Sequence, residues 1–139
     1  MSQYNNNAHG LILLIDDHIP LLRSMAFLLE VAGFDVVTAT SGMEAIDALR
    51  QQTPDLIISD VNMPGMDGYE LLQRIRSAAN WQDIPFIFAS AKYEMHDLLY
   101  GLELGANDYI PKPFDIYDVL DAIQRTAPQL IQADRRLAS

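Results

Sequence analysis

The sequence contains no cysteine among its 139 residues. It can therefore form no disulfide and no thiolate metal site, which leaves carboxylates and histidines as the strong side-chain metal ligands. It also lacks an apolar run long enough to span a membrane, and its start has neither the basic residues nor the apolar middle of a signal peptide. We therefore expect a cytoplasmic protein that makes no membrane contact.

Basic residues are scarce as well. Nine lysines and arginines face nineteen aspartates and glutamates, which gives a formal net charge of -10. A charge of this sign disfavours long-range attraction to nucleic acid or to anionic lipid. We expect no direct nucleic-acid binding by this chain. The length and the 50% hydrophobic content are sufficient for a single core.

Aliphatic runs that end at polar residues dominate the rest of the sequence. The run at 11–15 is continuous, which is typical of a strand that is covered on both faces in a parallel sheet, and it ends at Asp16 and Asp17. Pro20 suits a first helical turn and Gly33 a left-handed helix end, so a helix is expected between them. Further strands are expected at 34–38, 56–59, 85–89 and 108–110. Further helices are expected to begin near 41, 69, 95 and 116.

Five strands that alternate with five helices predict a doubly wound α/β fold with a parallel sheet. We expect a single domain at residues 10–126, preceded by a disordered N-terminal lead at 1–9. Pro128 should end or kink the last helix. Residues 127–139 are then a C-terminal tail or the stub of a connector, and the sequence does not decide between these alternatives.

The expected strand ends carry side chains that could bind a ligand or take part in a reaction. These are Asp16, Asp17, Asp60, Ser90 and Lys112. In open α/β sheets, ligands bind outside the carboxyl ends of the strands. Two carboxylates about 4 Å apart repel by about 4 kcal/mol at an effective dielectric near 20. Partial protonation or a divalent cation would relieve that repulsion, and an all-oxygen site suits Mg²⁺ or Mn²⁺.

Each of these residues also has an ordinary structural explanation. Asp16 and Asp17 could cap the following helix, the Ser90 hydroxyl could satisfy a backbone group, and Lys112 could be a solvated cation. Their combination favours a different interpretation, because carboxylates, a hydroxyl and an ammonium at neighbouring strand ends resemble a phosphoryl-transfer site. Asp60 would be the nucleophile in such a site.

The chain from residue 11 to residue 126 resembles the receiver domain of two-component response regulators. The resemblance implies a flavodoxin-like single domain with five helices and a five-stranded parallel sheet of order 2-1-3-4-5. It rests on four motifs in order: Asp16-Asp17, Asp60-Val-Asn-Met-Pro-Gly-Met-Asp-Gly68, Ser90-Ala91, and Tyr109-Ile-Pro-Lys112-Pro113-Phe114.

The resemblance implies that Asp60 accepts a phosphoryl group from a sensor histidine kinase or a histidine phosphotransfer protein. It implies that Mg²⁺ is held by Asp16, Asp17, Asp60 and the backbone carbonyl of Asn62. Ser90 and Lys112 would each contact a phosphoryl oxygen. The protein would then be a regulatory domain that catalyses only its own phosphoryl transfer and dephosphorylation.

Tyr109 is similar to the family's switch aromatic, which turns inward as Ser90 moves towards the phosphoryl group. A half-buried strand aromatic is an equally good interpretation of Tyr109 from the sequence. The resemblance implies that the fourth helix, fifth strand and fifth helix form the surface for an unidentified output partner, and also for a homodimer. It further implies a cis Lys112–Pro113 bond, and that Asn62 and Lys92 tune the loss of the phosphoryl group.

The histidines are expected to play no part in the site. His18 should lie in a loop or at a helix start, and His9 and His96 should be surface residues. Two other functions are alternatives: a pseudo-receiver, which has the same fold and needs no phosphorylation, and a metal-dependent phosphohydrolase that acts on an external substrate. The first is disfavoured because no residue of the site is substituted, and the second because no additional acid/base group is evident.

Overall fold

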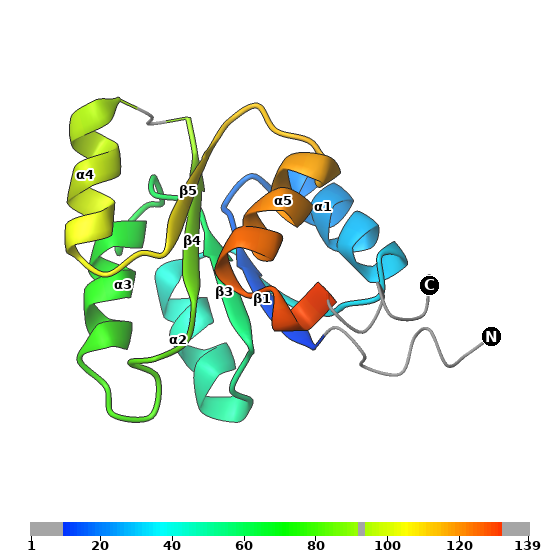
Figure 1. The fold of residues 1–139 in the computed structure, drawn as a ribbon. Helices are drawn as coiled ribbons and strands as arrows, with labels where there is room; N and C mark the ends of the chain where they lie inside the picture. Colours follow the sequence, from blue (N-terminus) through cyan, green and yellow to red (C-terminus); the bar gives the residue numbers. More distant parts are fainter. Residues whose placement is uncertain (1–9, 92–93, 132–139) are drawn as a thin grey trace.

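A computed structural model describes residues 10–91 and 94–131. In this part of the chain, a five-stranded parallel sheet has the order β2-β1-β3-β4-β5, which confirms the α/β class and the strand order (Figure 1). The expectations for the lead at 1–9, His9 and Lys92 lie outside the described residues. The strands are β1 (Leu11–Ile15), β2 (Asp35–Ala39), β3 (Leu56–Ser59), β4 (Phe86–Ser90) and β5 (Asp108–Pro111).

Helices cover both faces of the sheet. Helices α1 and α5 lie on one face, and α2, α3 and α4 lie on the other (Figure 1). The helices are α1 (Ile19–Val31), α2 (Gly42–Gln51), α3 (Gly68–Arg76), α4 (Met95–Glu103) and α5 (Ile116–Thr126). This arrangement places all five strand ends, and the loops that follow them, along one edge of the sheet.

The central strands are apolar apart from Ser59 and Ser90 at their ends, because both of their faces are covered. In β1, Leu13 and Ile15 belong to the core beneath α2, α3 and α4, whereas Ile12 and Leu14 belong to the core beneath α1 and α5. Each of these four side chains is at most 5% exposed. Burial of a side chain of this size stabilises the fold by about 1.5–3 kcal/mol, so the strand that delivers Asp16 is firmly anchored.

Three strands differ from the sequence-based expectation by one residue: β2 and β4 begin and end one residue later, and β5 extends to Pro111. Phe34 was expected in β2, but its N–H bonds the carbonyl of Leu29 at 3.1 Å and closes the end of α1 together with Gly33, which has φ 107°. Pro85 was expected in β4, but it has no N–H to donate to a ladder, and the strand begins at Phe86 and includes Ser90.

The packed structure continues past the end of α5. Pro128 interrupts the helix as expected, and a short helical turn follows at 129–131. Ala127 is fully buried and Leu130 is 7% exposed, and both pack in the core beneath α1 and α5. None of the described helices is both long and apolar enough to cross a membrane.

Candidate functional site

Three carboxylates converge at the ends of β1 and β3. These strands are paired, with Ile15 opposite Ser59, so Asp16 and Asp60 follow them at adjacent points of the sheet edge. One oxygen from each of Asp16, Asp17 and Asp60 lies within 4.8 Å of the others. Asp16 and Asp60 are only 6% and 7% exposed, whereas Asp17 is exposed. The structure therefore brings together the three acids that the sequence singled out.

Each buried carboxylate has one oxygen fixed by the backbone. Oδ1 of Asp16 accepts a hydrogen bond from the N–H of His18 at 2.9 Å. Oδ1 of Asp60 accepts from the N–H groups of Val61 at 2.7 Å and Asn62 at 3.3 Å. His18 is the N-cap residue of α1, so Asp16 closes a turn before the helix, and among the described residues it caps none of the helical N–H groups. The second oxygen of each carboxylate is directed elsewhere.

Lys112 joins the two second oxygens. Its Nζ donates to Oδ2 of Asp16 at 2.8 Å and to Oδ2 of Asp60 at 3.0 Å. The N–H of Lys112 also bonds the carbonyl of Ser90 at 3.0 Å, and the Lys112–Pro113 bond is cis, as expected. Burial lowers the pKa of Lys112, but the hydrogen bonds and charges of both aspartates outweigh it, so this pKa is raised overall. The ammonium therefore remains charged.

The start of α3 packs directly beneath Asp60. The N–H of Gly68 donates to the carbonyl of Val61 at 2.7 Å, and Asp67 caps the helix by accepting from the N–H of Glu70 at 2.9 Å. A Cβ at Gly68 would collide with the backbone oxygen of Asp60. Gly65, in contrast, has φ 79° and open space around its Cα, which is the behaviour of an ordinary turn glycine.

The donor set fits a hard divalent cation. All of the clustered ligands are oxygens, and among the described residues three carboxylates face the ammonium of Lys112, so negative charge is in excess there. Asp17 and Asn62 line one surface hollow beside this cluster. His18 is the N-cap residue of α1 and its side chain is exposed, in agreement with the expectation that it lies at a helix start.

Ser90 and Tyr109 lie behind the carboxylates, on β4 and β5. Ser90 is fully buried and Tyr109 is 3% exposed, so Tyr109 is far less accessible than a half-buried strand aromatic. Burial raises the pKa of Tyr109, a hydrogen bond with Tyr69 raises it further, and a hydrogen bond with Ser90 lowers it. Tyr109 is therefore turned inward, and its hydroxyl is bonded to residues on two other elements.

Sequence reasoning missed the role of Tyr69, which it placed only on the apolar stripe of α3. The side chain is 7% exposed, and its hydroxyl donates to the backbone carbonyl of Asp97 at 3.4 Å. The sequence does carry a signal for this contact, because a tyrosine on an otherwise aliphatic helix face is expected to be buried, and a buried hydroxyl needs a hydrogen-bond partner.

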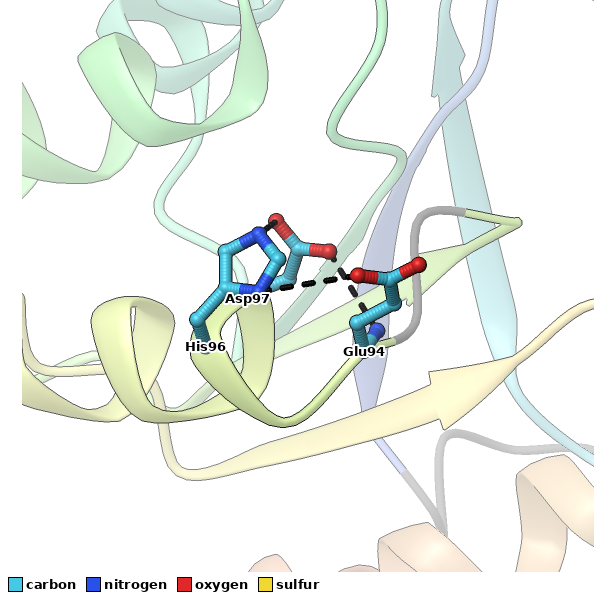
Figure 2. Close-up of side chains that lie close together, drawn as sticks. All are labelled: Glu94, His96 and Asp97. Carbon is cyan, nitrogen blue, oxygen red and sulfur yellow. Dashed lines mark hydrogen bonds and ion pairs between the residues drawn. The ribbon is translucent and has the colours of Figure 1, made fainter.

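A second group of side chains, Glu94, His96 and Asp97, gathers at the start of α4 (Figure 2). His96 is exposed, as expected, and its two ring nitrogens lie 3.6 Å from Glu94 and 3.4 Å from Asp97. Asp97 is buried and accepts a hydrogen bond from the N–H of Glu94 at 3.2 Å. The group therefore fixes the first turn of α4.

Comparison with known proteins relates the whole arrangement to one family. The model of the response regulator receiver domain matches residues 12–124. The chemotaxis protein CheY4 of Vibrio cholerae superimposes with a TM-score of 0.81 at 31% identity, covering 85% of this chain and 98% of that one. The receiver domain of the Francisella response regulator 1452 superimposes with a TM-score of 0.77 at 28% identity, covering 91% and 98%.

Curated relatives are longer than this chain. The transcriptional regulatory protein CpxR homolog of Haemophilus influenzae is 41% identical over 113 residues, which are 81% of this chain and 48% of that protein. The probable transcriptional regulator ycf27 of Cyanophora paradoxa is 42% identical over 103 residues, 74% of this chain and 42% of that protein. The chain thus spans less than half the length of these relatives.

Proposed function

Because the chain belongs to the response regulator receiver family of two-component signalling, we propose that it is a phosphorylation-dependent switch in which Asp60 is the phosphoacceptor. The observation that carries the proposal is the environment of Asp60, a nearly buried carboxylate between two further acids and the ammonium of Lys112. The phosphodonor would be the phosphohistidine of a sensor kinase or of a phosphotransfer protein.

The geometry suggests how Asp60 would act. Its Oδ1 is fixed by backbone N–H groups, whereas its Oδ2 is bonded to the flexible side chain of Lys112, which can follow an incoming anion. A carboxylate oxygen attacks phosphorus, the P–N bond of the phosphohistidine breaks, and its electron pair returns to the imidazole nitrogen. Lys112 then pairs with a phosphoryl oxygen, and the Ser90 hydroxyl donates to another.

Asp16, Asp17, Asp60 and the backbone carbonyl of Asn62 would hold Mg²⁺, or Mn²⁺ in its place. When bound, the cation supplies positive charge that offsets the crowding of carboxylate and phosphoryl oxygens. Asp16 would keep its backbone contact to His18 while its Oδ2 faces the site. Asp17, the exposed member of the cluster, is the acid that is most easily reached from solvent.

The output would be a change in the surface formed by α4, β5 and α5, transmitted through Ser90 and Tyr109. This surface would bind an output protein or domain, or a second copy of the chain. The relatives named as transcriptional regulators are more than twice as long as the segment that they share with this chain. With a net charge of -10, this chain would control such an output without contacting nucleic acid itself.

Labelling with radioactive acetyl phosphate tests the proposal. We expect incorporation into the wild-type protein that requires Mg²⁺ and is lost in Asp60→Asn. Asp47→Asn is the matched control, because Asp47 is an exposed acid on α2 that pairs with Arg50, and this variant should be labelled like the wild type. Labelling that persists in Asp60→Asn would show that another residue is the acceptor.

A further inference from the structure

Two consecutive peptide units follow Asp60, and both direct an N–H group at its carboxylate. The first unit joins Asp60 to Val61, and its N–H donates to Oδ1 of Asp60 at 2.7 Å. The second unit joins Val61 to Asn62, and its N–H donates to the same oxygen at 3.3 Å. The directions of these two N–H groups therefore determine where Oδ1 is held and which way Oδ2 faces.

Each of these peptide units is also held by its carbonyl group. The carbonyl of Asp60, in the first unit, accepts a hydrogen bond from the hydroxyl of Ser59 at 2.8 Å. The carbonyl of Val61, in the second unit, accepts from the N–H of Gly68 at 2.7 Å. Because a peptide unit is planar, a bond that fixes its carbonyl also fixes the direction of its N–H. Oδ1 of Asp60 is thus bonded to two peptide units that are each held at both ends.

The hydroxyl of Ser59 is the side-chain contribution to this arrangement. Ser59 is the last residue of β3 and is fully buried. Side chains alternate along a strand, so Ser59 shares with Ile57 the face beneath α2, α3 and α4. Limited space beneath α3 explains a small side chain at this position. It does not explain the hydroxyl, because alanine is small as well and carries no polar group that burial would penalise.

We propose that Ser59 is a positioning residue for phosphoryl transfer to Asp60. The inference rests on the proposed function, and it deepens it by naming a group that orients the acceptor carboxylate without touching the phosphoryl group. By holding the Asp60 carbonyl, the Ser59 hydroxyl keeps the N–H of Val61 on Oδ1. Oδ2 then remains the oxygen that faces Lys112 and the incoming phosphorus. Without the hydroxyl, the first peptide unit can rotate and the carboxylate loses its alignment for attack.

Hydrogen exchange of backbone amides tests the orientation itself. It is measured by NMR in the wild type and in Ser59→Ala, without metal and without phosphodonor. We expect the Val61 amide to exchange about tenfold faster in Ser59→Ala, because its peptide unit has lost the bond to its carbonyl. The Asp60 amide is the internal reference, since it bonds the carbonyl of Ile15 at 3.0 Å within the sheet. A general loss of stability would accelerate both amides by the same factor.

The rate of labelling by radioactive acetyl phosphate with Mg²⁺ tests the consequence for the reaction. We expect Ser59→Ala to be labelled about fivefold more slowly than the wild type. Ser77→Ala is the matched control, because the Ser77 hydroxyl also donates to a backbone carbonyl, that of Gln73, at 2.8 Å, but at the far end of α3. This variant should be labelled at the wild-type rate. Ser59→Thr and Ser59→Val add similar bulk and differ in the hydroxyl, so the threonine variant should be labelled faster than the valine variant.

A wild-type labelling rate in Ser59→Ala would overturn the proposal and show that position 59 requires only a small residue. Equal rates in Ser59→Thr and Ser59→Val, or equal acceleration of the Asp60 and Val61 amides, would overturn it as well. The two proposals can fail separately. If the wild-type protein takes up no label, the proposed function is wrong, while exchange of the Val61 amide in the unphosphorylated protein still tests whether Ser59 holds the peptide unit.

Discussion

At the scale of single residues, Lys112 is the cation that pairs with two nearly buried carboxylates. It donates to both Asp16 and Asp60, and its side chain is 18% exposed. A buried ion pair adds little net stability compared with apolar packing, but removal of one partner is costly because it leaves an uncompensated charge. Lys112 leaves two such charges when it is removed.

We expect Lys112→Met to lower the free energy of unfolding by about 2 kcal/mol without Mg²⁺, a value below that of a fully buried pair because the site is partly solvated. Mg²⁺ should restore part of the loss by supplying positive charge. Urea unfolding measures both effects. Arg74→Met is the control, because Arg74 pairs with Glu70 on the surface. This variant should change the free energy of unfolding by less than about 0.5 kcal/mol.

The same residue gives a pH dependence with a defined sign. The pKa of Lys112 is raised in the folded protein, so the stabilisation by its charge is fully present below its unfolded pKa of about 10.5. It is lost as the pH rises through the folded pKa. The difference in the free energy of unfolding between the wild type and Lys112→Met should therefore be constant at neutral pH and shrink above about pH 10.5. A difference that grows in alkali would contradict the paired ammonium.

At the scale of elements, the first turn of helix α3 packs closely against the backbone of Asp60. Gly68 permits this contact, because a side chain there would collide with the Asp60 carbonyl oxygen. We expect Gly68→Ala to push this turn away, to lower the stability by about 2–3 kcal/mol, and to slow labelling of Asp60 at temperatures where the protein is still folded. Gly65→Ala is the matched control. It should cost about 1 kcal/mol for its positive φ but leave the labelling rate unchanged.

The far end of α3 is tied to two loops by Arg76. Its guanidinium donates to the backbone carbonyls of Gln82, Ile84 and Gly105, and to the side chain of Asn107. A lysine in Arg76→Lys cannot make this set of hydrogen bonds. We therefore expect urea unfolding to show a loss of about 2 kcal/mol in the free energy of unfolding. Arg50→Lys, at an exposed pair on α2, should be neutral. Equal effects of the two substitutions would show that this set of hydrogen bonds contributes nothing specific.

How far the sequence predicts these elements depends on the range of the interactions that fix them. The run at 11–15 predicts β1 correctly because burial on both faces requires apolar residues throughout. The bond from Lys112 to Asp16 spans 96 positions, and only the assembled sheet brings these residues together. The partner of Tyr69 was missed for the same reason, since helical spacing predicts that this side chain is buried but not that its hydroxyl meets the backbone carbonyl of Asp97.

At the scale of the whole molecule, negative charge is concentrated where the parallel strands end. The net charge of -10 opposes compaction in general, and three carboxylates within 4.8 Å add a local repulsion that folding must overcome. A cation that binds the folded cluster and not the unfolded chain stabilises the protein by mass action. The Mg²⁺ dependence of stability therefore reports on the site without any phosphodonor.

We expect the melting temperature to rise and saturate with Mg²⁺, by roughly 8 °C at a concentration about 100-fold above the dissociation constant. NaCl at matched ionic strength separates this effect from general screening of the net charge, because screening acts on all acids equally.

Asp17→Asn should abolish most of the Mg²⁺-specific rise in melting temperature while leaving the paired Asp16 and Asp60 intact. Asp35→Asn removes the same charge from an exposed position on β2, away from the cluster, and should retain the full rise. If the two substitutions respond to Mg²⁺ identically, the cation acts on the net charge of the molecule, and the carboxylates at the strand ends do not form a metal site.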